Sequence, residues 1–196
     1  TSAVPSSGAI DLLTPLVYPD RHDYLSQMVS ELFARETATR ALLFPFMALY
    51  NVLTFGLAAG VWMAADGRRS RRFAAIALAG YAVASSAGLL VAAMDAREAG
   101  ITPQTVLHIA ATALQGMMML VALAAGAFAL GPGFRRYTVA TTLVALAASA
   151  AAGAMAGTSA PAGVGLLERV SIYLWMLWLA VLAARLRAES SRVEGA

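Results

Sequence analysis

The chain contains no cysteine and no lysine, and only two of its 196 residues are histidine. Without cysteine it has no disulfides, thiolate zinc sites, iron–sulfur clusters or cysteine nucleophiles. Charged residues make up 13% of the sequence, against about a quarter of a typical soluble domain. Hydrophobic residues make up 60%, and the mean hydropathy is +0.70. This composition excludes a soluble enzyme and an intrinsically disordered chain.

Five apolar runs are each long enough to cross a bilayer core as a helix of about 20 residues. We place them at 41–65, 73–94, 105–130, 138–157 and 164–185. No short segments of alternating hydrophobicity, the pattern of membrane β-barrel strands, occur in the sequence. The sequence therefore predicts an all-α, polytopic transmembrane helix bundle over residues 41–187.

The arginines predict how this bundle is oriented. They gather in the loops 66–72 and 131–137 and in the tail after residue 184. Because arginine-rich short loops mark the cytoplasmic side, we expect a cytoplasmic tail at 188–196 and residues 1–40 outside. The arginines form no single basic face, so the sequence pI of 9.7 does not indicate a nucleic-acid partner.

Residues 1–40 contain no signal peptide, yet the predicted topology requires their export. We expect a sixth helix or a cleaved signal ahead of residue 1; simple insertion with the N-terminus outside is the alternative. Within this segment, apolar residues at helical spacing predict an amphipathic helix of about three turns, capped by Asp20 or Asp23. These apolar residues are Tyr24, Leu25, Met28, Val29, Leu32 and Phe33. The helix is expected to lie on the outer interface or over the bundle, and the next helix to start at Thr37 or Thr39.

Few ionisable residues fall within the predicted spans, and such residues are costly in a membrane. His108, Thr112 and Gln115 share one helical face, which we expect to point into the bundle. His108 is then either a catalytic base or ligand, or a buried histidine whose hydrogen bonds join helices. The middle of the membrane is otherwise almost entirely apolar, which argues against a proton pump or an ion channel.

Glu168 and Arg169 open the last span. One interpretation is an ion pair, either between these two residues or with Asp95 and Arg97. The other is a binding site for a lipid headgroup or for a partner subunit, because the arginine fork matches phosphate geometry.

Catalysis is a separate hypothesis. Ser30, His108 and Asp95 can be combined into a serine–histidine–acid set, although no G-x-S-x-G motif is present. A zinc site needs three or four ligands and a haem pair would need His22 and His108, so we predict no metal and no cofactor. Trp175 and Trp178 lie well inside the last span and are expected to pack in the core.

Four landmarks carry a family resemblance: Ser26 to Leu32 before the first span, Asp95 after the second, His108 early in the third, and Gly165 to Arg169 before the final tryptophan-containing helix. With them the chain resembles the bacterial membrane family called domain of unknown function 998. The resemblance implies six helices and implies that Ser30, Asp95, His108, Glu168 and Arg169 match the family's polar positions. It implies no activity. A fainter similarity to the ceramidase and adiponectin-receptor hydrolases conflicts with their need for three histidines.

These observations lead to two functional hypotheses. The first is a non-enzymatic membrane subunit or lipid-binding module, whose extracytoplasmic polar pocket holds a lipid headgroup or another membrane subunit through Glu168, Arg169, Thr112 and Gln115. The alternative is a membrane-embedded hydrolase of lipid esters or amides that uses Ser30, His108 and Asp95.

Overall fold

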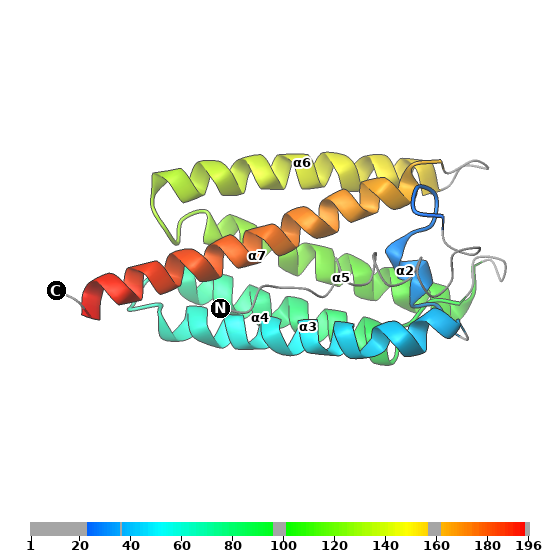
Figure 1. Cartoon of the computed structure of the whole chain (residues 1–196), viewed down its shortest axis with the longest axis horizontal. Coiled ribbons are helices and arrows are strands. Elements are labelled where there is room, and N and C mark those ends of the chain that lie inside the picture. The colour runs from blue at the N-terminus through cyan, green and yellow to red at the C-terminus, as the bar shows by residue number, and fades with distance from the viewer. Residues whose placement is uncertain (1–22, 36, 96–100, 157–161, 195–196) are drawn as a thin grey trace.

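Five long helices run side by side and alternate in direction, and a single-turn helix lies at one end of the bundle (Figure 1). The structure, a computed structural model, describes residues 23–35, 37–95, 101–156 and 162–194. In chain order the helices are α2 (Val29–Leu32), α3 (Ala38–Met63), α4 (Arg69–Leu90), α5 (Pro103–Gly126), α6 (Pro132–Ala156) and α7 (Val164–Glu194).

All five long helices are long and apolar enough to cross a membrane. Many of their large apolar side chains point outward, including Val52, Leu114 and Leu143, which are between 45% and 64% exposed. In a bilayer such a surface faces acyl chains rather than water. The predicted multi-pass helix bundle is therefore confirmed.

Several helices begin or end outside the apolar runs that predicted them, whereas α4 ends at Leu90, inside its predicted run. α4 already begins at Arg69, α6 begins at Pro132, and α7 continues to Glu194, so most of the predicted tail is helical. Arginine is a good helix former, and its long side chain can extend to the membrane surface from within the first or last turn. Hydropathy alone therefore placed these helix ends too far inward.

The predicted amphipathic helix of three turns is wrong in its length. Of the described residues 23–35, only Val29–Leu32 is helical; its N-cap is Met28 rather than Asp23, and Asp20 lies outside the described residues. Residues 23–28 form turns that Asp23 stabilises by accepting hydrogen bonds from the Leu25 and Ser26 amides at 3.0 and 3.4 Å. The apolar spacing arises instead because Val29 and Leu32 are buried against the bundle. The predicted start of the next helix is confirmed, because Thr37 is the residue that precedes α3.

α7 joins two groups of helices. α4 packs closely against α3 and α5, α6 packs against α7, and α5 contacts α6 only lightly. Trp175 donates a hydrogen bond to Tyr50 of α3 (2.9 Å), and Trp178 donates one to Thr138 of α6 (2.9 Å). Both indoles are almost completely buried and stack with their centroids 5.2 Å apart, which confirms their predicted packing role.

The arginine-rich end is held together by Arg71, whose side chain is buried. Its guanidinium donates to the Ala129 carbonyl (3.1 Å), to the Ala64 carbonyl (2.8 Å) and to the Glu189 carboxylate. One side chain of α4 thereby connects the end of α3, the turn between α5 and α6, and the end of α7.

Candidate functional site

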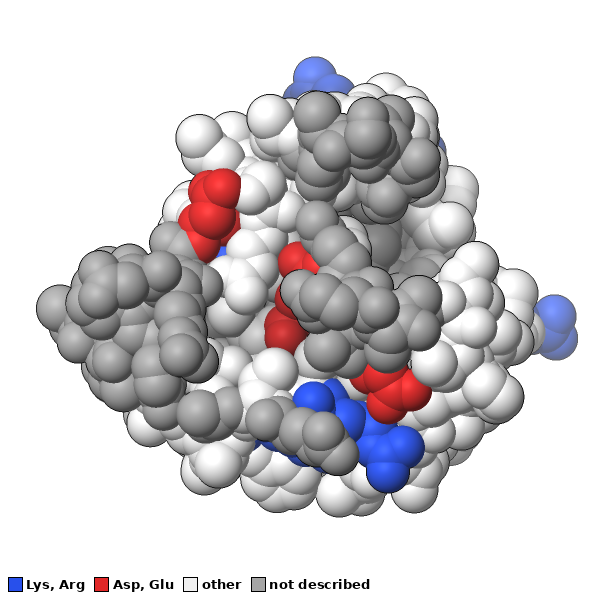
Figure 2. Space-filling view, turned by 90° about the vertical axis from the view of Figure 1, so that its right-hand side faces the viewer, with Lys and Arg blue, Asp and Glu red and all other residues white. Residues whose placement is uncertain are grey.

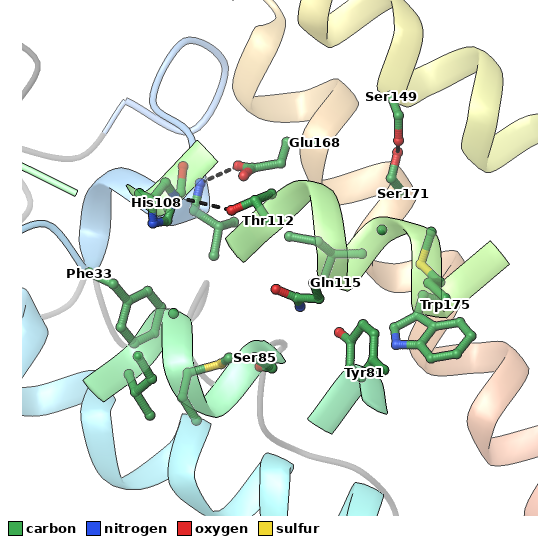
Figure 3. Close-up of a pocket in the computed structure, with 18 of the residues that line it drawn as sticks. Phe33, Tyr81, Ser85, His108, Thr112, Gln115, Ser149, Glu168, Ser171 and Trp175 are labelled. Carbon is green, nitrogen blue, oxygen red and sulfur yellow. Dashed lines mark hydrogen bonds between the residues drawn. The ribbon is translucent and has the colours of Figure 1, made fainter. Parts of the chain in front are cut away.

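A cavity of about 340 Å³ lies in the half of the bundle nearer α2 (Figure 3). Volumes of this size hold small molecules in other proteins. The lining is contributed by every described helix: Val29, Ser30, Phe33, Met47, Tyr81, Ser85, Gly88, Leu89, Ala93, His108, Thr112, Gln115, Gly116, Met119, Ser149, Ala152, Glu168, Ser171, Ile172 and Trp175.

The two ends of the cavity differ in polarity. His108, Thr112 and Glu168 lie together at one end, whereas Tyr81 and Trp175 lie at the other (Figure 3). Along α5 the lining continues from His108 to Met119, a rise of roughly 16 Å at 1.5 Å per residue. The carboxylate and the imidazole of the lining therefore lie near the end of the bundle, whereas uncharged polar side chains such as Gln115 and Ser171 continue among apolar ones toward its middle.

Residues Asp23–Arg35, here called the cap segment, cover this end of the bundle between α3 and α7 (Figure 1). Arg169 fastens the cap segment to α7. Its Nη1 donates to the carbonyl oxygens of Tyr24 (3.1 Å), Gln27 (2.7 Å) and Gly165 (3.1 Å), and its guanidinium lies 4.3 Å from the centroid of the Tyr24 ring. Arg169 is 1% exposed. The geometry makes it a clamp within the protein.

Three further residues of α7 complete the clamp. The Glu168 carboxylate accepts a hydrogen bond from the Val29 amide at the start of α2. The amides of Gly165 and Leu166, which have no partner inside α7, donate to the Leu25 carbonyl at 2.8 and 3.3 Å. A Cβ on Gly165 would lie 2.3 Å from the Gln27 carbonyl oxygen, so glycine permits this close approach.

His108 stabilises the irregular end of α4. The helix stops at Leu90, which leaves several carbonyls without helical partners. Gln104 donates to the carbonyls of Val91 (2.8 Å) and Ala93 (2.9 Å), and His108 Nδ1 lies 2.8 Å from the Ala92 carbonyl oxygen. A carbonyl only accepts, so Nδ1 carries the proton and Nε2, which is 3.5 Å from the Thr112 hydroxyl, is left as an acceptor.

Asp95 makes its hydrogen bond and its ion pair with residues other than His108. Its carboxylate accepts a hydrogen bond from Thr102 (2.6 Å) and lies 3.9 Å from the Arg35 guanidinium. These contacts tie the connection after α4 to the cap segment and to the start of α5. Viewed onto this end, the molecule shows acidic side chains near the centre of the face and basic ones beside them (Figure 2).

One side of the cavity is not closed by helix packing. The buried residues of α5 are Ala122, Leu123 and Gly126, all in its last two turns. Two residues that line the cavity across this gap, Thr112 of α5 and Ser149 of α6, are exposed. Because α5 and α6 make few contacts, the cavity opens between them toward the region that acyl chains occupy in a bilayer.

The structure therefore divides the residues singled out from the sequence into two sets. Ser30, His108, Thr112, Gln115 and Glu168 line one cavity. Asp95 and Arg169 do not, and their described contacts are within the protein. His22 and Arg97 lie outside the described residues. Among the described residues, no group of three or more histidine, aspartate and glutamate side chains is arranged to hold a metal ion.

The model of the family described as protein of unknown function (DUF998) matches residues 3–185. The chain belongs to this family. No curated protein and no solved structure matches the chain. Family membership therefore agrees with the membrane-spanning helical fold but assigns no activity. Any function must be inferred from the cavity.

The positions of four residues at the cavity and the cap segment were not predicted from the sequence. Tyr81, Ser85 and Trp175 line the cavity although they read as ordinary packing residues of apolar helices. Gly165 belongs to the landmark that ends at Arg169, but nothing in the sequence predicts its close contact with the cap segment. Only Ser85, a buried hydroxyl in an alanine-rich helix, offered a hint.

Proposed function

We propose that this chain is a non-enzymatic membrane protein that holds one lipid-like amphiphile in the cavity under the cap segment. The observation that carries the proposal is the lining of the cavity: its carboxylate and imidazole lie at the cap end, apolar and uncharged polar side chains line the deeper part, and the side between α5 and α6 is open. This arrangement suits a molecule with a small polar head and an apolar chain that continues into the bilayer.

The position of the cavity supports an extracytoplasmic site. The arginines of the described residues 68–72, 135, 136, 185 and 187 lie at the opposite end from the cap segment. The positive-inside rule puts that opposite end in the cytoplasm, so the cap segment and the polar end of the cavity face the outside of a bacterial inner membrane. The occupant would then come from the outer leaflet or from a partner membrane protein.

Filling the cavity tests the proposal. Gly116 lines the cavity, and a Cβ there meets no atom within 4 Å, so Gly116→Leu adds a side chain to empty space. Gly153→Leu is the matched control, because Gly153 is an exposed helical glycine outside the lining. We expect native mass spectrometry of the purified chain to show a co-purified lipid that Gly116→Leu removes and Gly153→Leu retains. Equal lipid retention in both variants would contradict the proposal.

One observation favours hydrolysis as a second candidate. Ser30 and His108 line the same cavity, and His108 Nε2 is the nitrogen free to accept a proton. In this mechanism the Ala92 carbonyl, in place of Asp95, holds the imidazole in the required tautomer. Turnover of a long-chain p-nitrophenyl ester that is abolished by both Ser30→Ala and His108→Gln would support a hydrolase. No turnover by the folded wild-type chain would exclude this candidate for esters.

A further inference from the structure

We infer that the cavity selects an amphiphile with an uncharged, hydroxyl-bearing head, of which diacylglycerol is the simplest lipid class, and rejects lipids with a phosphate head. This inference rests on the proposed function and specifies its ligand. It replaces the recognition of phosphate by Arg169 that the sequence suggests.

The charges around the cavity are the first argument. No arginine is among the described lining residues, whereas the carboxylate of Glu168 is. The guanidinium of Arg169 donates to carbonyls of the cap segment, and that of Arg40 donates to the carbonyls of Phe33 (2.9 Å) and Leu89 (2.7 Å). A phosphate in the cavity would lie beside a carboxylate without a lining cation, and this repulsion is strong where water is excluded.

The hydrogen-bonding groups are the second argument. His108 Nε2 is an acceptor, Thr112 has a hydroxyl group, and Gln115 carries both a donor and an acceptor amide. A lipid hydroxyl can donate to the imidazole and accept from an amide or a hydroxyl without introducing charge. The Glu168 carboxylate already accepts from the Val29 amide, so it does not require a cationic head as a partner.

The space available is the third argument. At about 340 Å³ the cavity accommodates a small head and the first part of a chain, and the gap between α5 and α6 lets the rest lie in the membrane. Deeper in the cavity the lining is uncharged and includes apolar side chains such as Met119 of α5 and Ile172 of α7. Glycerol with one free hydroxyl fits these limits better than a bulky or charged head.

Competition between lipids that share the same acyl chains tests the inference. The purified full-length chain is incubated with an equimolar mixture of diacylglycerol, phosphatidic acid and a trimethylammonium diacyl lipid, and bound lipid is counted by native mass spectrometry. Cavity-specific retention is the amount of bound lipid that is lost in Gly116→Leu but kept in Gly153→Leu. We expect cavity-specific retention of diacylglycerol to exceed that of phosphatidic acid by about tenfold or more.

The outcomes separate this inference from the proposed function. If phosphatidic acid or the cationic lipid equals or exceeds diacylglycerol in cavity-specific retention, the head-group assignment is overturned while lipid binding stands. If Gly116→Leu changes the retention of none of the three lipids, the proposed function itself fails.

A charge variant tests the cause of the selectivity. Glu168→Gln keeps an oxygen that can accept from the Val29 amide but removes the negative charge. We expect this variant to raise the cavity-specific retention of phosphatidic acid relative to that of diacylglycerol several-fold. If Glu168→Gln still binds diacylglycerol and rejects phosphatidic acid as strongly as the wild type, then Glu168 does not exclude phosphate. That result would overturn the electrostatic explanation of the selectivity.

Discussion

At the scale of single residues, the cap segment depends on contacts between side chains of α7 and backbone atoms far away in the chain. Arg169 and Gly165 both meet Gln27, which lies well over 100 positions earlier in the sequence. Contacts of this kind are costly to lose, because buried polar groups that lose their partners are not rehydrated. The closure of the cavity is therefore sensitive to very small changes at residues 165–169.

Gly165→Ala tests the close approach. The added methyl group would lie 2.3 Å from the Gln27 carbonyl oxygen, so the cap segment must move. We expect a loss of about 1–3 kcal/mol of stability, measured as a lower midpoint of thermal unfolding in detergent. Gly153→Ala is the control, since its methyl group enters open space and helix propensity alone makes it neutral or slightly stabilising. Equal midpoints for both variants would contradict the account.

Arg169→Met tests the clamp. Methionine approximates the length of the apolar stem but donates no hydrogen bond, so the carbonyls of Tyr24 and Gln27 lose their partner. We expect the cap segment to become at least about tenfold more sensitive to limited proteolysis, with cleavage between residues 23 and 35. Arg187→Met removes an exposed arginine at the other end and should leave the cleavage rate unchanged. A resistant Arg169→Met protein would refute the clamp.

The sequence identified the polar residues of the site but not their roles. Glu168 and Arg169 stood out because charges inside an apolar run are costly. Their partners, however, are backbone groups of residues 24–30, and every residue type offers such groups. Nothing in the sequence distinguishes a carbonyl at position 27 from any other. For the same reason the sequence suggests Asp95 as the hydrogen-bond partner of His108, whereas in the structure His108 Nδ1 bonds to the Ala92 carbonyl oxygen.

At the scale of elements, the long helices were predictable and the short cap helix was not. An apolar run of 20 residues has one stable form in a membrane, since its backbone groups must bond internally. The cap segment lies at the end of the bundle, where turns, side chains and α7 satisfy the backbone equally well. Of the apolar residues at 24–33, Val29 and Leu32 are buried but Tyr24 and Leu25 are exposed, so the spacing indicated burial only in part and helix length incorrectly.

Arg71→Gln tests the element contacts at the arginine-rich end. Glutamine cannot reach all three partners of Arg71, which belong to α3, to the turn after α5 and to α7. We expect a loss of about 3 kcal/mol, because Glu189 and two carbonyls lose a buried partner. Unfolding is followed by circular dichroism on heating. Arg136→Gln, at an exposed position of the same end, is the control and should change the unfolding midpoint little. If the two variants have equal midpoints, Arg71 does not hold these elements together.

At the scale of the whole molecule, the distribution of charge predicts the orientation in the membrane. The absence of cysteine makes the test direct, since each introduced thiol is the only one present. Ala162→Cys lies at the cap end and Ser191→Cys at the arginine-rich end, both exposed. In intact cells of a bacterial host, a membrane-impermeant maleimide should label Ala162→Cys alone, and Ser191→Cys only after the cells are lysed. The reverse labelling pattern would contradict the proposed topology.

Photo-cross-linking shows directly whether an amphiphile occupies the cavity between α5 and α7. The wild-type chain in membranes is irradiated with diacylglycerol that carries a diazirine in its acyl chain, and the adducts are mapped by peptide mass spectrometry. We predict adducts on Met119 and Ile172, which line the cavity, and their loss in Gly116→Leu. Adducts confined to outward-facing residues such as Ile109 and Leu177 would contradict occupancy of the cavity.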